Sequence, residues 1–527
     1  MEIHDLLTIT DFIVVGVYIL ILVGIGYWAS FRDKKDVDEN LFLAGNSLNW
    51  TSIGFTMWGT NVGPSMLIAS ASIGYTTGIV AGNFAWYAFI FIFLLAVVFA
   101  PRYLGAKTQT LPEFMGKRFG DSTQNILAWY TIVTVLISWL SLTLFAGGIL
   151  IQQILGIPMW LSIIVLIIIA SFFTIAGGLK AIAATNVFQM ILLIVVSLAL
   201  TITGIYKIGG IETLISETPS EYWNLFLPAD DPNYPWIAII LGYPVMGVWF
   251  WCTDQSMVQS VLGAKNIKQG QLGANFTGWL KILDVPLFIL PGVICFILYP
   301  DLQNPDEAYM TMVTKMFPVG MTGLVMAVLI AALVSTIDSA LNALSTVFTI
   351  DIYVKKFKPE ASQKRIVKIG RAVTVVGALL AIFITLAINS IKGLNLFDVF
   401  QSILGFIAPP MSVVFLFGVL WKKTTTRAVN VILILGTILS MGVGVFYLWV
   451  FPAADYDFWP HFLLLSFYIF VFLSVLIVIL SLNEKSKNQY VSTLDYGELS
   501  KLKPSAKVMW AALFIVMIGL YIFFNGN

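Results

Sequence analysis

Long apolar runs recur from one end of this sequence to the other, and they constrain its fold more than any other feature. An α-helix needs about 20 apolar residues to cross the hydrocarbon core of a bilayer. With 59% hydrophobic and 11% charged residues, the chain has too little polar surface for a water-soluble globule. The sequence therefore predicts an all-α polytopic membrane protein with about 14 transmembrane helices. We expect them at 9–31, 48–72, 78–103, 122–155, 158–177, 181–206, 236–258, 271–300, 318–353, 366–390, 395–420, 426–451, 459–482 and 505–525.

The basic residues predict how these spans are oriented. If the loop after the first span faces the cytoplasm, all but four of the 29 Lys and Arg fall in cytoplasmic loops. The exceptions are Lys207, Lys281, Lys315 and Lys392. This bias follows the positive-inside rule, so we expect a multi-pass protein of the plasma or inner membrane with both termini outside the cytoplasm.

Several other classes of protein are disfavoured. The acidic start before the first span is unlike a signal peptide, so we expect that helix to be retained. Cys252 and Cys295 lie inside apolar spans, which argues against disulfides or zinc. The net charge of +1 gives no sign of nucleic-acid binding, and nothing indicates an obligatory protein partner. His4 and His461 lie near membrane edges with no paired nucleophile and base, so we expect no enzyme activity.

Two of the apolar runs are interrupted, at 59–64 (GTNVGP) and around Gly242, Pro244 and Gly247. A broken helix survives in a membrane only where protein or a water-filled cavity satisfies its backbone groups. Breaks in corresponding helices of two halves are typical of secondary transporters, in which they surround the substrate and the coupling ion. No G-x-x-x-x-G-K-[ST] loop occurs, so a gradient must supply the energy unless the protein is a passive channel.

The positions of the breaks predict how the chain is divided. We expect an extra N-terminal helix at 9–31, a first repeat of five helices at 48–206 and an extracytoplasmic loop at 207–235. A second, inverted repeat of five helices follows at 236–420. Three scaffold helices occupy 426–525 and include a cytoplasmic linker at 483–504. Such a repeat builds its binding site where the two halves meet.

One span carries a row of side-chain oxygens. Ser335, Asp338, Ser339 and Asn342 stand at i, i+3, i+4 and i+7 and therefore share one helical face. A carboxylate in mid-membrane is a functional candidate by default. A small hard cation prefers oxygen ligands, and the unwound carbonyls near Gly59 could complete its shell. The alternative is that these hydroxyls only allow close helix packing.

Further polar groups lie within the spans. Lys281 and Asp284 form either a structural ion pair or an edge of the substrate cavity. Asp254, after an aromatic run, is a gate or a helix-end anchor. Gln401, near Phe397, either orients a polar ligand or bonds between helices.

Several motifs taken together resemble one family, the sodium:solute symporters that include the sodium/glucose cotransporters and have the LeuT-type fold. The matching runs are 42–45 (FLAG), 111–114 (LPEF), 117–119 (KRF), 177–179 (GGL), 251–255 (WCTDQ), 349–353 (TIDIY), Phe397-Asp398 and Gln401-Ser402. They span residues 10 to 425, and beyond them the likeness is one of hydropathy alone.

The resemblance implies a sodium site and a possible second one. The common site of the family corresponds to the carbonyls of Gly59, Val62 and Ala332 and the hydroxyls of Ser335 and Thr336. A second ion site in the family uses a carboxylate after Gly-Gly-Leu. That position is Asn186 here, and Asp338 and Ser339 occupy the other two. The charge has moved across the site, so a second ion is possible but not implied.

The sugar-binding pattern departs further from the family. Positions that are polar in galactose-binding relatives correspond to Met66, Ala85, Ala88 and Gly247, and the inner aromatic gate is Phe250, beside Trp251. Lys281 and Gln401 remain. Unpaired sugar hydroxyls would cost about 1 to 3 kcal/mol each, so the familiar glucose or galactose pose is disfavoured.

The sequence as a whole favours a sodium-coupled symporter that imports a small polar solute, such as a sugar, polyol or sugar derivative, by alternating access. Two alternatives stay open. One is a sodium-coupled importer of organic anions such as monocarboxylates or uronates. The other is a proton-coupled transporter in which Asp338 carries the proton.

Overall fold

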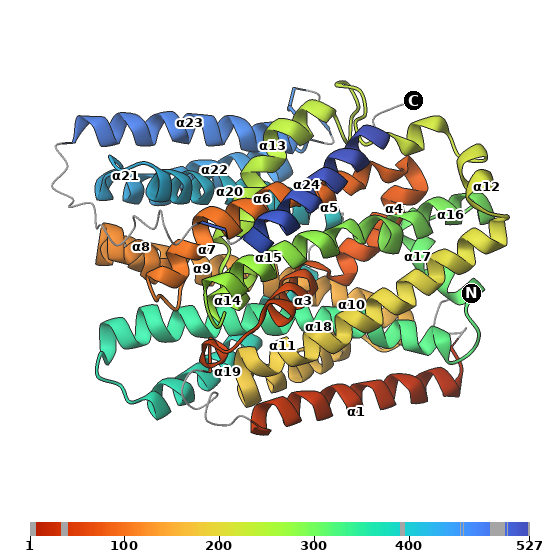
Figure 1. The fold of residues 1–527 in the computed structure, drawn as a ribbon, viewed down its shortest axis with the longest axis horizontal. Helices are drawn as coiled ribbons and strands as arrows, with labels where there is room; N and C mark the ends of the chain where they lie inside the picture. The colour runs from red at the N-terminus through yellow and green to blue at the C-terminus, as the bar shows by residue number, and fades with distance from the viewer. Residues whose placement is uncertain are drawn as a thin grey trace.

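The computed structural model describes residues 7–32, 41–389, 396–453, 455–456, 458–484, 501–502 and 504–524. Within these ranges the chain forms helices and no strand, apart from two isolated bridges. Figure 1 shows that most of the long helices run in the same general direction, as expected of a membrane bundle.

The first half of the bundle runs from α1 to α11. Its helical segments are α1 (Ile9–Arg32), α3 (Trp50–Asn61), α4 (Pro64–Thr77), α5 (Gly82–Trp86), α6 (Ala88–Leu94), η4 (Leu95–Phe99), α7 (Ala100–Gly105), α8 (Leu111–Phe119), α9 (Asp121–Thr134), η5 (Val135–Ser141), α10 (Leu142–Leu155) and α11 (Met159–Ile208). Segments η4 and η5 are π-helical turns that continue the α-helices on either side.

The second half begins after the segment at 207–235, which includes α12 (Ile211–Ser216). Its segments are α13 (Trp236–Val248), η7 (Trp249–Thr253), α14 (Gln255–Leu262), α15 (Ile267–Ile282), η8 (Val285–Ile289), α16 (Leu290–Leu298), α17 (Ala308–Met316), α18 (Met321–Val347), η10 (Phe348–Phe357), α19 (Gln363–Asn389) and α20 (Leu396–Leu420). The chain continues through α21 (Thr426–Val431), η11 (Ile432–Gly436), α22 (Thr437–Val445), η12 (Phe446–Val450), α23 (Phe462–Asn483) and α24 (Pro504–Phe523). The predicted linker at 483–504 lies mostly outside the described residues.

The described part of the chain contains 12 helices that are long and apolar enough to cross a membrane, two fewer than we predicted. One difference arises because α11 joins two predicted spans across Gly178, whose backbone is left-handed (φ 54°). The other arises because the predicted span 48–72 is the pair of short helices α3 and α4. Both differences therefore come from local breaks in helical geometry and not from missing apolar segments.

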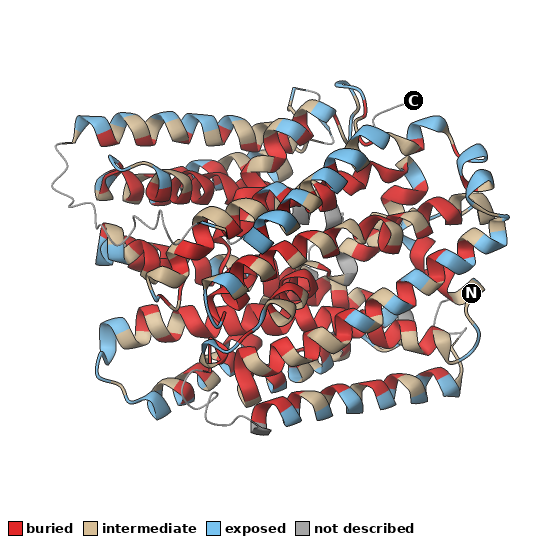
Figure 2. Ribbon diagram, in the orientation of Figure 1, coloured by how far each residue is buried: buried red, intermediate tan, exposed pale blue. Residues whose placement is uncertain are grey.

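Helix α18 forms the centre of the bundle. It is apolar on almost every side and nearly all its residues are buried, which is typical of a helix surrounded by others. It packs against α1, α3, α10, α11 and α19, and Figure 2 shows it as an almost continuous buried band. The polar face predicted on this helix is therefore enclosed by protein.

The two ends of the chain lie toward the same end of the bundle (Figure 1). Asp11 at the start of α1 accepts hydrogen bonds from the backbone N–H groups of Gly320 and Gly323 before and within α18, at 2.7 and 2.8 Å. Near the end of α24, the carbonyl of Phe524 accepts from the N–H of Leu225. Which face of the membrane this end occupies stays a prediction.

The first predicted break is confirmed. Helix α3 ends at Asn61 and α4 begins at Pro64, with Val62 (φ −83°, ψ 77°) and Gly63 (φ −85°, ψ 155°) outside helical geometry. Pro64 has no N–H to donate to the carbonyl of Thr60, and the N–H of Gly63 bonds to Asn61. The carbonyls of Gly59 and Thr60 thus lose their usual helical donors.

The second predicted break is misplaced. Helix α13 continues through Gly242, Pro244 and Gly247, and the chain leaves helical geometry only at Asp254 (φ −83°, ψ 128°). A side chain at Gly242 would collide with the backbone of Leu463, and one at Gly247 with the ring of Phe91. These glycines therefore permit close helix packing and do not unwind the helix.

Candidate functional site: the helix breaks, the buried oxygens and the cavity

The break after α3 faces the oxygen-bearing side of α18. The hydroxyl of Thr336 donates to the carbonyl of Thr60 at 3.3 Å and to that of Ala332 at the same distance. A Cβ placed on Gly59 would lie 3.1 Å from the Oγ of Ser335. The structure therefore brings together the two elements that the sequence predicted to share a sodium ion.

Ser335 is the informative member of this group. Its side chain is fully buried, and its Oγ has no hydrogen-bond partner among the described residues. An unpaired buried hydroxyl costs free energy unless a ligand or water satisfies it. Together with carbonyls released by the break, it forms an oxygen set of the kind that a small hard cation prefers.

A second polar cluster lies one turn farther along α18. The Oγ of Ser339 accepts from the hydroxyl of Thr60 at 2.9 Å, and it donates at 3.4 Å to Oδ1 of Asp338. The other oxygen of Asp338 has no partner among the described residues, nor do the side-chain amides of Asn186 and Gln189 on α11. All three side chains are fully buried. Gln189, three residues after Asn186 on a helix that packs against α18, was not singled out by the sequence reasoning.

Lys281, near the end of α15, and Asp284, just before η8, form a buried ion pair, as one of the two predicted interpretations has it. Both members of the pair form hydrogen bonds to α3, the helix that ends at the first break. The ammonium group donates to Oδ1 of Asn61 at 2.7 Å, and the indole N–H of Trp58 donates to Asp284 at 2.8 Å. Since Asp284 neutralises Lys281, the lysine presents little net charge to a solute.

A cavity of about 140 Å³ lies beside this network. Its walls come mainly from the two broken helices, η5 and the start of α5. The lining residues are Asn61, Met66, Ala69, Ser70, Ile73, Ala81, Phe84, Trp139, Tyr243, Met246, Gly247, Trp249, Phe250, Trp251 and Leu404. The cavity is predominantly apolar and aromatic, with a few polar groups, as is usual for small-molecule sites.

The predicted substrate residues divide into three groups. Met66, Gly247, Phe250 and Trp251 line the cavity. Ala85 and Ala88 are buried but do not line it. Lys281 does not line it either, but its ammonium group donates to the lining residue Asn61 and lies 5.7 Å from the ring centroid of the lining residue Trp251. The side chains of Phe397 and Gln401 in α20 lie outside the described residues.

Most of the lining residues were not predicted as part of the solute site, and Asn61 and Trp139 are the two with side-chain hydrogen bonds to the polar groups described above. Asn61 lies within the interrupted run itself and could have been found from that signal. Trp139 lies in η5, and its indole N–H donates to Oδ2 of Asp254 at 3.1 Å. Nothing in the sequence pattern around Trp139 distinguishes it from an ordinary core tryptophan.

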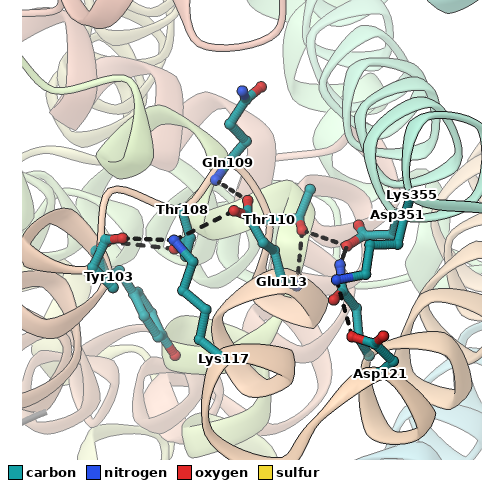
Figure 3. Close-up of polar contacts among 11 residues, drawn as sticks. Tyr103, Thr108, Gln109, Thr110, Glu113, Lys117, Asp121, Asp351 and Lys355 are labelled. Carbon is teal, nitrogen blue, oxygen red and sulfur yellow. Dashed lines mark hydrogen bonds and ion pairs between the residues drawn. The ribbon is translucent and has the colours of Figure 1, made fainter. Parts of the chain in front are cut away.

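The predicted cytoplasmic end of the bundle is held by a separate polar network around α8. Thr110, the N-cap of α8, donates to Oδ1 of Asp351 at 3.0 Å (Figure 3). The same oxygen accepts from Gln124 at 2.7 Å. The next residue, Leu111, donates its N–H to Gln255 of α14 at 2.8 Å. Thr110 and Leu111, at the start of α8, therefore bond to η10 and α14 respectively.

Comparison with known proteins gives the same family along most of the chain. The model of the sodium:solute symporter family matches residues 41–436. Sodium/glucose cotransporter 4 from Danio rerio is 31% identical over 466 residues, which is 82% of this chain and 71% of that protein. Sodium/myo-inositol cotransporter 2 from Homo sapiens is also 31% identical, over 82% of this chain and 69% of that protein.

Solved structures support the fold. The outward-open, substrate-bound structure of a Na+-coupled sialic acid symporter superposes with a TM-score of 0.78 at 18% identity, covering 92% of this chain and 100% of that one. A nucleobase-cation-symport-1 family transporter in a closed conformation gives a TM-score of 0.52 at 13% identity, over 89% and 97% of the two chains. The fold is thus of the LeuT type. The protein is a sodium-coupled solute transporter and not an enzyme, and the chain belongs to the sodium:solute symporter family.

Proposed function

We propose that this protein imports a small neutral sugar, polyol or sugar derivative together with sodium by alternating access. The observation that carries the proposal is the unpaired, fully buried hydroxyl of Ser335 beside the helix break at Gly59. Relatives named as sodium/glucose and sodium/myo-inositol cotransporters support this class of solute.

In this proposal the sodium ion binds between α3 and α18. Its ligands are the carbonyls of Gly59, Val62 and Ala332 and the hydroxyls of Ser335 and Thr336. A bound ion would join the two elements, stabilise the outward-open form and order the solute cavity. One sodium ion moving down ~100 mV and a tenfold gradient releases about 2.3 + 1.4 kcal/mol, enough for roughly 500-fold accumulation of solute.

The buried ion pair supports a neutral solute over an organic anion. Asp284 already satisfies the charge of Lys281, so a carboxylate in the cavity would lose its hydration without gaining a free cation. Asn61 accepts from Lys281 through Oδ1, which leaves its amide N–H groups to donate to a solute oxygen. Monocarboxylates and uronates are therefore the weaker alternative.

The direct test is thermal stabilisation of the purified protein by a panel of sugars, polyols, uronates and amino acids, each with and without sodium. We expect stabilisation by a neutral sugar or polyol that depends on sodium. Stabilisation by uronates alone would favour the anion alternative, and stabilisation that ignores sodium would contradict the proposal.

Asn61→Ala is expected to raise the KM of the transported sugar or polyol by about tenfold, because one hydrogen bond to the solute is lost and Lys281 is left facing the cavity. Sodium-dependent uptake into proteoliposomes measures this change. Ser70→Ala removes another polar side chain that lines the cavity. A similar rise in KM in this variant would show that losing any polar lining group weakens solute binding. An unchanged KM in Asn61→Ala would exclude Asn61 from the solute site.

Asp338 supports a second candidate, in which this carboxylate binds a further cation or a proton. We expect Asp338→Asn to lower uptake and to make its dependence on sodium concentration less steep, since a buried carboxylate without a cationic partner favours binding a cation. Asp351→Asn, a buried carboxylate at the end of the same helical segment, is the matched control. Wild-type uptake that follows pH but ignores sodium would instead identify proton coupling.

A further inference from the structure

The wall of the cavity contains an aromatic contact between η5 and η7, and one of its two members, Trp139, was not among the predicted solute-site residues. Trp139 comes from the π-helical turn η5, and Phe250 from the π-helical turn η7. Their ring centroids lie 5.3 Å apart and both residues line the cavity. Widened π-helical turns are frequent at functional sites.

The indole N–H of Trp139 forms a hydrogen bond at the second helix break, where the chain leaves helical geometry at Asp254. The N–H donates to Oδ2 of this residue, at which η7 ends and α14 begins. The other oxygen of Asp254 accepts from the N–H of Met257 at 3.1 Å and caps α14. Trp139 and Asp254 are 5% and 4% exposed, so water does not compete for the bond. One carboxylate thus both begins α14 and binds it to η5.

We propose that Trp139 is a positioning residue that couples occupancy of the cavity to the position of α14. The ring of Trp139 is a wall for the solute, and its N–H bond to Asp254 holds α14 against η5, which closes this side of the cavity. Since α14 leads toward the predicted cytoplasmic end, it cannot move away from η5 until this bond breaks. A solute that displaces the ring of Trp139 therefore weakens the bond and permits opening.

This inference rests on the proposed sodium-coupled transport. Its test begins with variants that distinguish the aromatic wall formed by the Trp139 ring from the hydrogen bond between Trp139 and Asp254. Trp139→Phe keeps an aromatic wall and removes the donor. Asp254→Ser keeps a helix cap but is too short to reach Trp139. Trp223→Phe is the control, because it removes an indole N–H bond, to Thr218, in the segment 207–235 away from the cavity.

The measurement is uptake of radioactive sodium into proteoliposomes without solute. We expect Trp139→Phe and Asp254→Ser each to raise this leak roughly tenfold, the effect of losing one hydrogen bond to a charged group. Trp223→Phe should leak as little as the wild type. The double variant Trp139→Phe/Asp254→Ser should leak no more than either single variant, because both remove the same bond.

A wild-type leak in Trp139→Phe, or additive leaks in the double variant, would overturn the inference. If Trp139→Phe does not fold, as judged by its thermal unfolding midpoint, Asp254→Ser decides alone. Sodium-dependent thermal stabilisation of the wild type separates this outcome from failure of the proposed function. Without that stabilisation the sodium site itself is wrong, whereas with it an unchanged leak refutes only the role of Trp139.

Discussion

Replacing both Ser335 and Thr336 by alanine is expected to abolish sodium-dependent uptake. The double variant removes the two hydroxyls and leaves at most three carbonyls for the ion, and a hard cation then keeps too few oxygen ligands to shed its water. Folding should survive, because the hydroxyl of Ser335 has no hydrogen-bond partner in the described structure to lose and the 3.3 Å bonds of the Thr336 hydroxyl contribute only about 1 kcal/mol. Uptake of a sugar or polyol at varied sodium concentration measures the effect.

The matched control is Ser466→Ala. Ser466 on α23 is also fully buried and its hydroxyl is also unpaired among the described residues, but it lies outside the helix breaks. It should transport as the wild type does. If the Ser335/Thr336 variant keeps the sodium dependence of the wild type, the assignment of the sodium site is wrong.

The second large effect is expected at the buried ion pair. Among the described residues, Lys281→Met leaves the buried carboxylate of Asp284 with the indole N–H of Trp58 as its one remaining side-chain partner. Removing one member of a buried pair typically lowers the free energy of unfolding by about 3–5 kcal/mol. The thermal unfolding midpoint in detergent should therefore fall sharply in the single variant.

The double variant Lys281→Met/Asp284→Asn distinguishes the effect of an unpaired buried charge from the effect of lost side-chain contacts. Its stability should return close to that of the wild type, because no isolated charge remains and the amide that replaces the carboxylate can still accept from Trp58. Uptake should stay low, since Asn61 loses the ammonium group that orients it.

Lys355→Met serves as the control for removing a lysine. It breaks an ion pair with Asp121 in which Lys355 is 46% and Asp121 81% exposed, and exposed pairs contribute at most about 1 kcal/mol. A Lys281→Met protein as stable as this control would show that the buried pair does not stabilise the fold.

The sequence predicted the helix break at 59–64 because its cause is local. Proline has no N–H and glycine tolerates unwinding, so the run itself shows where helical bonding fails. The same reasoning misplaced the second break at Gly242, Pro244 and Gly247. There the glycines are required by the neighbours Leu463 and Phe91, which local composition does not reveal.

The oxygen face of α18 was predictable for a similar reason. Spacing along one helix places Ser335, Asp338 and Ser339 on one side without any knowledge of the neighbours. Spacing along α18 does not show which groups of other helices approach that face. The contact of Thr336 with Thr60 joins residues 276 positions apart; the preference of a cation for oxygen ligands suggested that the break near Gly59 meets this helix, and the resemblance to a family named the individual residues.

By itself the sequence determined that the chain is a bundle of membrane helices, that the span at 48–72 is broken at 59–64 and which helical face carries the oxygens. Each of these depends on apolarity, proline or periodicity, which are properties of short segments. Only the tertiary structure decided that Asp284 neutralises Lys281, that Asn61 joins this pair to the cavity and that Trp139 reaches Asp254. Those contacts exist because helices from distant parts of the chain pack against one another, and the register of that packing is set by the whole bundle.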